Sequence, residues 1–383
     1  MDSYIGRCIY HYPHPLETKP VGSGVRPVMM LKALKKIGYC VDEITGYGKE
    51  RKVKIKNVID KINSGEKYDF LYSESLTEPT LLAEKNHLPL HPLMDYKLWK
   101  TCQKHGIPVG LFYRDIYWKY PIYKKSVPMY KRCITVPLYY LDLAMYKKYV
   151  SVLSCPTEKF SNVIDIDIEK SVLPPGCIEN KNVIASKLNK QFGRPKVSLF
   201  YVGSIKGTYD IRIVFEAVKK CEFVELVVCT PKEQWSETKA RYGDLLCDRV
   251  KIVHMRGGEL TDLYKQADVS LYLLQPNEYL GIASPIKCKE TVGYGTPMVA
   301  SCNTGAADGI SKDSYGWIID YNLSSILQLF KHLYENPDEI KRKTLNTIDA
   351  IGVNSWEYRA QCISAKLLSN NMEGSDNNFG ISV

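Results

Sequence analysis

The sequence predicts an α/β protein made of two Rossmann-like domains, each with a parallel sheet between helices. Short apolar, β-branched runs alternate with segments of helical period through both halves of the chain. Glycine-containing loops follow the carboxyl ends of several of these runs, as they do in doubly wound sheets. Because 383 residues exceed one ordinary hydrophobic core, two domains are expected.

The composition is typical of a soluble globular protein, with 45% hydrophobic and 25% charged residues. Residues 1–10 lack the apolar segment of a signal peptide, and no run is long enough to span a bilayer. Twelve cysteines without any C-x-x-C pair are typical of reduced thiols in a cytosol. The net charge of +10 favours an anionic partner, which leaves a nucleotide sugar, a phospholipid surface or a nucleic acid.

The first predicted domain covers residues 1–176 and begins with a strand over residues 4–10. A long loop follows it and leads into a segment of helical period, so the chain opens as a βαβ unit. Gly22 and Gly24 in that loop allow the backbone to approach a ligand at the start of the helix. Pro27 stands where the third glycine of G-x-G-x-x-G belongs, so the dinucleotide fingerprint is incomplete.

Three more strand-like runs follow, and the last of them ends at Arg114 and Asp115. This position is the carboxyl edge of a parallel sheet, where active-site groups collect. Asp115 is a candidate for orienting or deprotonating an acceptor hydroxyl. The alternatives are a local ion pair with Arg114 or a capping aspartate.

Residues 117–150 interleave lysine and arginine with tyrosine and tryptophan, and they contain almost no acidic residue. Basic side chains attract anionic lipid, and aromatic rings suit the headgroup layer, so the segment predicts a patch that faces a membrane surface. An alternative is a helical pair whose tyrosines pack on the first domain. Such a stretch could also follow single-stranded nucleic acid, but no nucleic-acid-binding motif is present, so no nucleic-acid partner is expected.

A Pro-Pro-Gly sequence ends the first domain, and the polar residues 177–196 are predicted to be a linker. The second domain, residues 197–352, opens with an apolar strand that ends in Gly203 and Ser204, followed closely by Lys206. Asp268 ends a helix just before another strand, where a structural role is expected.

Asp165 and Asp167 form a D-x-D pair of the kind that holds a divalent metal in some glycosyltransferases. Isoleucines alternate with these acids, as in a half-exposed strand. No metal site is therefore expected.

The most informative stretch is residues 278–301, which lie between two apolar strands and must contain a short helix. Ser284 is the expected N-cap and Pro285 the first helical residue. The helix would direct its free N–H groups at the carboxyl edge of the sheet, where a phosphate binds. Lys287 and Glu290 are three residues apart and share a face, so the lysine can meet a diphosphate and the carboxylate a ribose diol. The alternative is a surface ion pair.

The spacing S-P-x-K-x-x-E followed by G-Y-G-T-P-x-V-A-S resembles the donor-binding segment of GT-B glycosyltransferases of family 4, which build bacterial surface polysaccharides. The resemblance implies two facing Rossmann-like domains, with Glu290 on the nucleotide ribose and Lys206 and Lys287 as catalytic residues that neutralise the leaving group. A second family glutamate is replaced here by Ile282. The residues implied to lie against the diphosphate or the sugar are Gly22, Gly24, Gly203, Ser204, Ala283, Ser284 and Pro285.

The same resemblance places the acceptor on the first domain. His11, His14 and Arg114 are the candidate acceptor contacts, although a loop histidine can also be merely solvated. It also implies that a helix over residues 353–368 crosses back to the first domain. The polar residues 369–383 have the composition of a disordered tail.

The function implied is transfer of a sugar from a nucleotide-diphosphate donor to a glycan or lipid-linked glycan acceptor in capsule, exopolysaccharide or O-antigen synthesis. Retention of anomeric configuration and independence from metals and other cofactors are expected, in a cytoplasmic protein bound peripherally to the inner face of the plasma membrane. The alternative is a non-catalytic, nucleotide-sugar-binding or membrane-associated partner of a transferase, which Ile282 favours.

Overall fold

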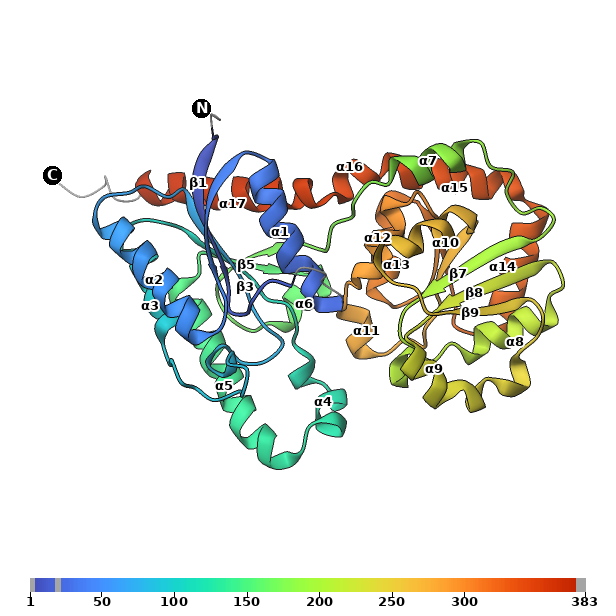
Figure 1. The fold of residues 1–383 in the computed structure, drawn as a ribbon, viewed down its shortest axis with the longest axis horizontal. Helices are drawn as coiled ribbons and strands as arrows, with labels where there is room; N and C mark the ends of the chain where they lie inside the picture. The colour runs from blue at the N-terminus through green and yellow to red at the C-terminus, as the bar shows by residue number, and fades with distance from the viewer. Residues whose placement is uncertain (1–3, 18–21, 377–383) are drawn as a thin grey trace. The chain divides into compact units, whose positions relative to one another are not determined.

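The computed structural model describes residues 4–17 and 22–376, which form two α/β units (Figure 1). The first unit comprises Met1–Pro174 together with Trp356–Val383, and the second comprises Pro175–Ser355. Each unit contains a six-stranded sheet in which every strand pairing is parallel. The predicted α/β class with two Rossmann-like domains is confirmed.

The sheet of the first unit has the strand order β2-β1-β3-β4-β5-β6. Its strands are short and largely buried because helices cover both faces of a parallel sheet. The chain order reverses between β1 and β3, and ligands bind at the carboxyl ends of strands at such a switch point. The strands are β1 (Gly6–Tyr12), β2 (Tyr39–Thr45), β3 (Phe70–Glu74), β4 (Val109–Phe112), β5 (Val152–Cys155) and β6 (Glu169–Val172).

Helices from both ends of the chain cover this sheet. Leu367 of the last helix packs directly on Gly110 of β4, where a Cβ atom would lie 2.8 Å from the leucine Cδ1. The helices are α1 (Val25–Lys36), α2 (Gly48–Asn63), α3 (Met94–Lys104), α4 (Pro121–Ser126), α5 (Met129–Tyr149), α6 (Glu158–Val163) and α17 (Trp356–Asp376).

The last helix differs from its prediction. It begins at Trp356 rather than at residue 353, and it continues to Asp376, so the expected disordered tail is wrong for residues 369–376. Polar composition misled here because a helix already held on one side by packing extends easily through polar residues. Residues 377–383 lie outside the described residues.

The sheet of the second unit has the order β12-β11-β10-β7-β8-β9. The strands are β7 (Val197–Val202), β8 (Val224–Cys229), β9 (Val250–Val253), β10 (Val269–Tyr272), β11 (Met298–Ser301) and β12 (Gly316–Ile319). The helices are α7 (Lys181–Leu188), α8 (Arg212–Lys220), α9 (Lys232–Thr238), α10 (Leu260–Gln266), α11 (Glu278–Ile282), α12 (Ile286–Gly293), α13 (Gly305–Asp313), α14 (Leu323–Glu335), α15 (Pro337–Asp349) and α16 (Ile351–Asn354).

Residues 177–196 are not a simple linker, because α7 packs within the second unit. Lys187 is buried and donates to the Ala267 carbonyl at 2.7 Å. The lysine-rich composition suggested a solvated segment, but a lysine stem can be buried when its ammonium finds a partner.

The structural role of Asp268 is confirmed, since its Oδ2 accepts the Ser198 amide at 2.9 Å and its Oδ1 pairs with Lys190 at 2.7 Å. Among the described residues, no helix combines the length and the apolar character needed to cross a membrane.

Candidate functional site

The parallel sheet of the second unit brings the predicted donor residues to one edge. Strands β7 and β10 are neighbours, with Val269 opposite Leu199. Their carboxyl ends therefore place the loop that carries Gly203 and Lys206 on the same edge as the segment before α12.

Helix α12 begins one residue later than expected. Pro285 occupies the N-cap position in an extended conformation, and no side chain caps the helix, so Ser284 is not its N-cap. Proline suits the N-cap as well as the first turn because its missing N–H would have no partner at either position. The first N–H groups of α12 are therefore not satisfied by a side-chain cap.

The backbone before α12 is held by close packing. Gly305, the first residue of α13, lies against the Ala283 carbonyl, which would be 1.9 Å from a Cβ atom at that position. Only glycine permits this approach. The position of residues 283–285 is thus set by a neighbouring helix.

Lys287 and Glu290 share one face of α12, as predicted, and they form the ion pair that was the alternative to ligand binding, with 2.7 Å between Nζ and Oε2. Both side chains remain partly exposed, at 36% and 26%. Burial raises the pKa of the Cys229 thiol, and the charge of Lys287 opposes that rise. The positive charge of Lys287 therefore acts on Cys229, which is the last residue of β8.

The loop after β7 is engaged differently from its prediction. The Gly203 amide donates to the Cys229 carbonyl at 3.0 Å and continues the β7–β8 ladder, so it is not available to a phosphate. The Ser204 hydroxyl donates to Gln234 Oε1 at 2.9 Å. Lys206 forms an exposed ion pair with Glu237. Of the predicted residues in this loop, only Lys206 therefore has an exposed charged group that can move toward a phosphate.

Three residues that the sequence reasoning missed lie at the same edge. Thr230 follows β8, and His254 and Arg256 follow β9. The His254 ring nitrogen Nδ1 lies 2.7 Å from the Thr230 carbonyl. These residues could have been found with the rule that singled out Gly203, because each comes directly after an apolar strand.

Several buried hydroxyls at this edge have no hydrogen-bond partner among the described residues. They belong to Thr230, Tyr272 and Ser301, which lie at the ends of β8, β10 and β11. Buried hydroxyls normally have a partner, so each of these three could hydrogen-bond to a polar group at this edge.

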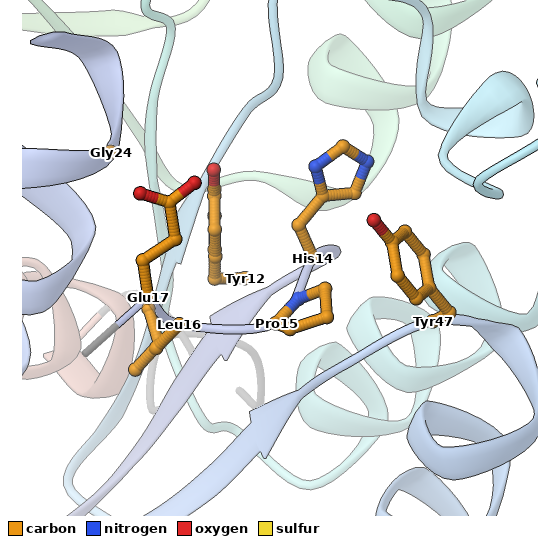
Figure 2. A pocket seen from close by; sticks show the side chains of 7 residues that line it. All are labelled: Tyr12, His14, Pro15, Leu16, Glu17, Gly24 and Tyr47. Atoms are coloured by element: carbon orange, nitrogen blue, oxygen red, sulfur yellow. The ribbon is translucent and has the colours of Figure 1, made fainter. Parts of the chain in front are cut away.

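The carboxyl edge of the first sheet contains a pocket of about 140 Å³ (Figure 2). Rings surround it, with the His14 ring centroid 6.1 Å from that of Tyr12 and 5.3 Å from that of Tyr47. Gly24 at the start of α1 supplies part of its wall. The lining residues are Tyr12, His14, Pro15, Leu16, Glu17, Gly24 and Tyr47.

His14 lines this pocket and is backed by a carboxylate. Its Nε2 lies 3.2 Å from Glu78 Oε1. Burial would raise the pKa of Glu78, but the interaction with His14 outweighs it and holds that pKa below its usual value. The pocket wall therefore combines aromatic faces with an ionised carboxyl group behind the imidazole.

His11 is not a loop residue, and the prediction that it contacts an acceptor is wrong. It lies on β1, which extends to Tyr12, and is fully buried. Its Nδ1 lies 2.8 Å from Ser73 Oγ and its Nε2 lies 2.9 Å from Asp95 Oδ1. His11 is buried because both faces of the parallel sheet are covered and residues 8–12 of β1 are all buried, whereas His14 lies beyond the end of the strand.

Arg114 and Asp115 lie after β4, as predicted. Arg114 pairs with buried Glu74, with 3.5 Å between Nη2 and Oε2, and its guanidinium lies 5.8 Å from the Tyr12 ring centroid. Asp115 Oδ1 accepts the Tyr117 amide at 2.9 Å. This contact is the capping role that was the alternative for Asp115.

Gly22 adopts a left-handed conformation with φ of 54° and begins the short 3-10 turn Gly22–Gly24 before α1. Residues 18–21 of the same loop lie outside the described residues. Within the described ranges, no group of three or more histidine, cysteine, aspartate or glutamate side chains is placed to hold a metal ion.

No protein-family model matches the chain, and neither does any curated protein sequence. The solved structures do contain similar folds. A glycosyltransferase from Rickettsia africae has a TM-score of 0.64 at 13% identity and covers 96% of this chain and 100% of its own. A sucrose-phosphate synthase from Thermosynechococcus elongatus has a TM-score of 0.63 at 12% identity, and the match covers 94% of this chain and 98% of the synthase chain.

HepE from Anabaena, solved in complex with UDP, has a TM-score of 0.63 at 11% identity and covers 95% of this chain and 100% of its own. These similarities extend over nearly the whole length of each chain. They establish that this chain has the GT-B fold.

Proposed function

We propose that this chain is a glycosyltransferase that moves a sugar from a nucleoside-diphosphate donor to a glycan or lipid-linked glycan acceptor, with retention of anomeric configuration. The observation that carries the proposal is the Lys287–Glu290 pair on α12, at the carboxyl edge of a Rossmann-like sheet in a GT-B chain. Structures of Anabaena HepE with UDP and with UDP-glucose support a nucleotide-sugar ligand for this fold.

The donor half of the reaction needs positive charge near the leaving group. As the bond between the anomeric carbon and the diphosphate breaks, negative charge grows on the phosphate oxygen. Lys287, Lys206 and the uncapped N-terminus of α12 would stabilise it. Glu290 can accept ribose hydroxyls while it keeps Lys287, because a carboxylate has about four acceptor sites.

The acceptor half is assigned to the pocket of the first unit. The rings of Tyr12, His14 and Tyr47 offer apolar faces to a sugar ring, and Arg114 lies behind Tyr12. In the retaining reaction the acceptor oxygen bonds to the anomeric carbon on the face that the diphosphate leaves. Its proton passes to the departing phosphate oxygen, so no protein base is required.

The proposal includes a cytoplasmic, metal-independent enzyme of surface-polysaccharide assembly. The cysteines support the compartment, since all twelve are thiols in the structure. Lys206 and Lys287 support metal independence, because they would supply at the diphosphate the positive charge that a metal ion could otherwise provide.

A second candidate is a non-catalytic subunit that binds a nucleotide sugar for a partner transferase. Ile282 favours it, because this residue is buried at the end of α11 where the resembled family has a sugar-contacting glutamate. Slow release of free sugar from the nucleotide sugar without any acceptor would count against this candidate.

Calorimetric titration with UDP, GDP and ADP tests the donor site. We expect one of the three to bind, and Glu290→Ala to weaken that binding by about 1–3 kcal/mol, the range for a hydrogen bond to a charged group. The nucleotide that binds then sets the sugar donors to screen for transfer.

The control is Glu216→Ala on α8, which removes an exposed carboxylate from a similar ion pair with Lys220 in the same unit. It should leave the titration unchanged. Unaltered affinity in Glu290→Ala would contradict the ribose contact, and absence of binding by all three diphosphates would contradict the donor site.

A further inference from the structure

Helix α5 has an unusual distribution of exposed side chains. Its buried face, formed by Tyr139, Asp142, Leu143 and Tyr146, packs on the first unit. The opposite face would ordinarily be polar. Instead, its exposed residues are mostly apolar, namely Met129, Tyr130, Cys133, Ile134, Pro137, Tyr140 and Ala144.

The exposure of this face is large and concentrated at one end of the helix. Met129 is 72% exposed, Tyr130 67%, Ile134 59% and Tyr140 57%. Helix α4 precedes α5 along the chain, and the two form a hairpin at one end of the first unit (Figure 1). Apolar residues grouped in this way mark an interaction surface more often than isolated ones do.

The other half of the segment anchors the hairpin to the residues that follow β3. Trp118 stacks on Tyr139 with ring centroids 4.9 Å apart, and the Tyr139 hydroxyl donates to the Thr77 carbonyl at 2.7 Å. Buried Asp142 accepts the Thr80 amide at 2.9 Å. The packing alternative thus holds for these residues, and it leaves the opposite face presented outward.

The charge on the hairpin has one sign. Residues 117–150 contain seven basic side chains and a single acidic one, Asp142, which is buried. Lys124 and Lys125 at the end of α4 and Lys131 in the first turn of α5 are exposed beside the apolar residues. Cationic side chains around exposed aromatic and aliphatic ones match the headgroup layer of an anionic bilayer.

We propose that the exposed face of the α4–α5 hairpin binds the surface of an anionic lipid bilayer. The lysines would pair with headgroup phosphates, while Met129, Tyr130 and Ile134 enter the headgroup layer. This inference is independent of the proposed sugar transfer, because it rests on a surface remote in sequence from the donor residues.

Vesicle sedimentation of the full chain tests the surface. We expect binding to vesicles of equal parts phosphatidylglycerol and phosphatidylcholine, weakened by added salt, and little binding to phosphatidylcholine alone. Charge reversal in the triple variant K124E/K125E/K131E should weaken binding about a hundredfold. Y130S/I134S should also weaken it while leaving the far-ultraviolet circular dichroism unchanged.

A matched control on α2 is K52E/V53S/K56E, which alters exposed lysines and an exposed valine of the same unit. It should bind vesicles like the unaltered chain. The proposal is overturned if the control loses as much binding as the hairpin variants, or if the unaltered chain ignores anionic vesicles. It is also overturned if the hairpin variants abolish self-association in ultracentrifugation instead. Retained nucleotide titration would separate this failure from failure of the donor site.

Discussion

His11 and His14 are three residues apart, yet they have opposite surroundings. One lies inside the sheet between Ser73 and Asp95, and the other lines a pocket against Glu78. The end of β1 at Tyr12 decides the difference, because His11 belongs to a strand that is covered on both faces and His14 lies in the loop that follows. At the residue scale, the residue type alone therefore did not separate a histidine in the core from a histidine that lines a pocket.

Asp115 carries a direct test of the retaining mechanism. Asp115→Asn keeps an oxygen that can accept the Tyr117 amide, so we expect kcat for sugar transfer to change less than about tenfold. Loss of a true general base would instead cost about 10²–10⁴-fold. Initial rates measured across pH would distinguish the two, since removal of a base also removes the acidic limb of the profile. A hundredfold loss would favour inversion.

At the scale of the element, α12 depends on its neighbours for its position. Its N-terminus has no side-chain cap, and Gly305 of α13 packs against the Ala283 carbonyl in the segment that leads into it. At its other end, the Gly293 carbonyl accepts the Asn180 amide at 2.8 Å. The position of the helix, and with it that of Lys287 and Glu290, is therefore set by residues far away in sequence.

Gly305→Ala tests whether the packing of α13 on Ala283 positions α12. The new Cβ would overlap the Ala283 carbonyl, so the loop before α12 must move. We expect the free energy of unfolding to fall by about 1–3 kcal/mol, as for overpacking, and the affinity for the bound diphosphate to fall with it. Chemical denaturation and calorimetry measure the two effects.

Gly352→Ala is the control, because its Cβ meets open space within α16 and its backbone is helical. It should be neutral or slightly stabilising. If Gly305→Ala lowered stability and left diphosphate affinity intact, residues 283–285 would not contact the phosphates.

At the scale of the whole molecule, the chain leaves the first unit at Pro174 and contributes its last helix to it from Trp356 onward. The strands of the first sheet all precede the second unit in sequence, but one of the helices that cover the sheet follows it. Arg26 connects the first sheet with the last helix. It donates to Glu74 of β3 at 3.1 Å, and its guanidinium also lies 5.9 Å from the ring centroid of Trp356 in α17. The C-terminal helix is a structural part of the first unit.

Leu367→Ala tests this role of α17. The side chain is fully buried against Gly110, so its removal should lower the free energy of unfolding by about 2–5 kcal/mol. Leu368→Ala, at a neighbouring position that is 37% exposed, should change it by less than about 0.5 kcal/mol. Diphosphate affinity should be unchanged in both variants, because the donor residues belong to the other unit. A loss of affinity in Leu367→Ala alone would contradict that assignment.

The sequence by itself determined the α/β class, the two units and the sheet edge that the segments of Lys206, Lys287 and Glu290 follow. These follow from local periodicity and from a rule of parallel sheets, in which carboxyl ends share an edge. Only the tertiary structure decided that the Gly203 amide is used in a ladder, that Asp115 caps a turn, that α7 is folded rather than a linker, and which tyrosines of residues 117–150 are buried. Most of those outcomes depend on partners distant in sequence, such as Cys229 for Gly203 and Ala267 for Lys187, and local pattern carries no information about such partners. The contact of Asp115 with Tyr117 is local, but it was one of several roles that the sequence left open.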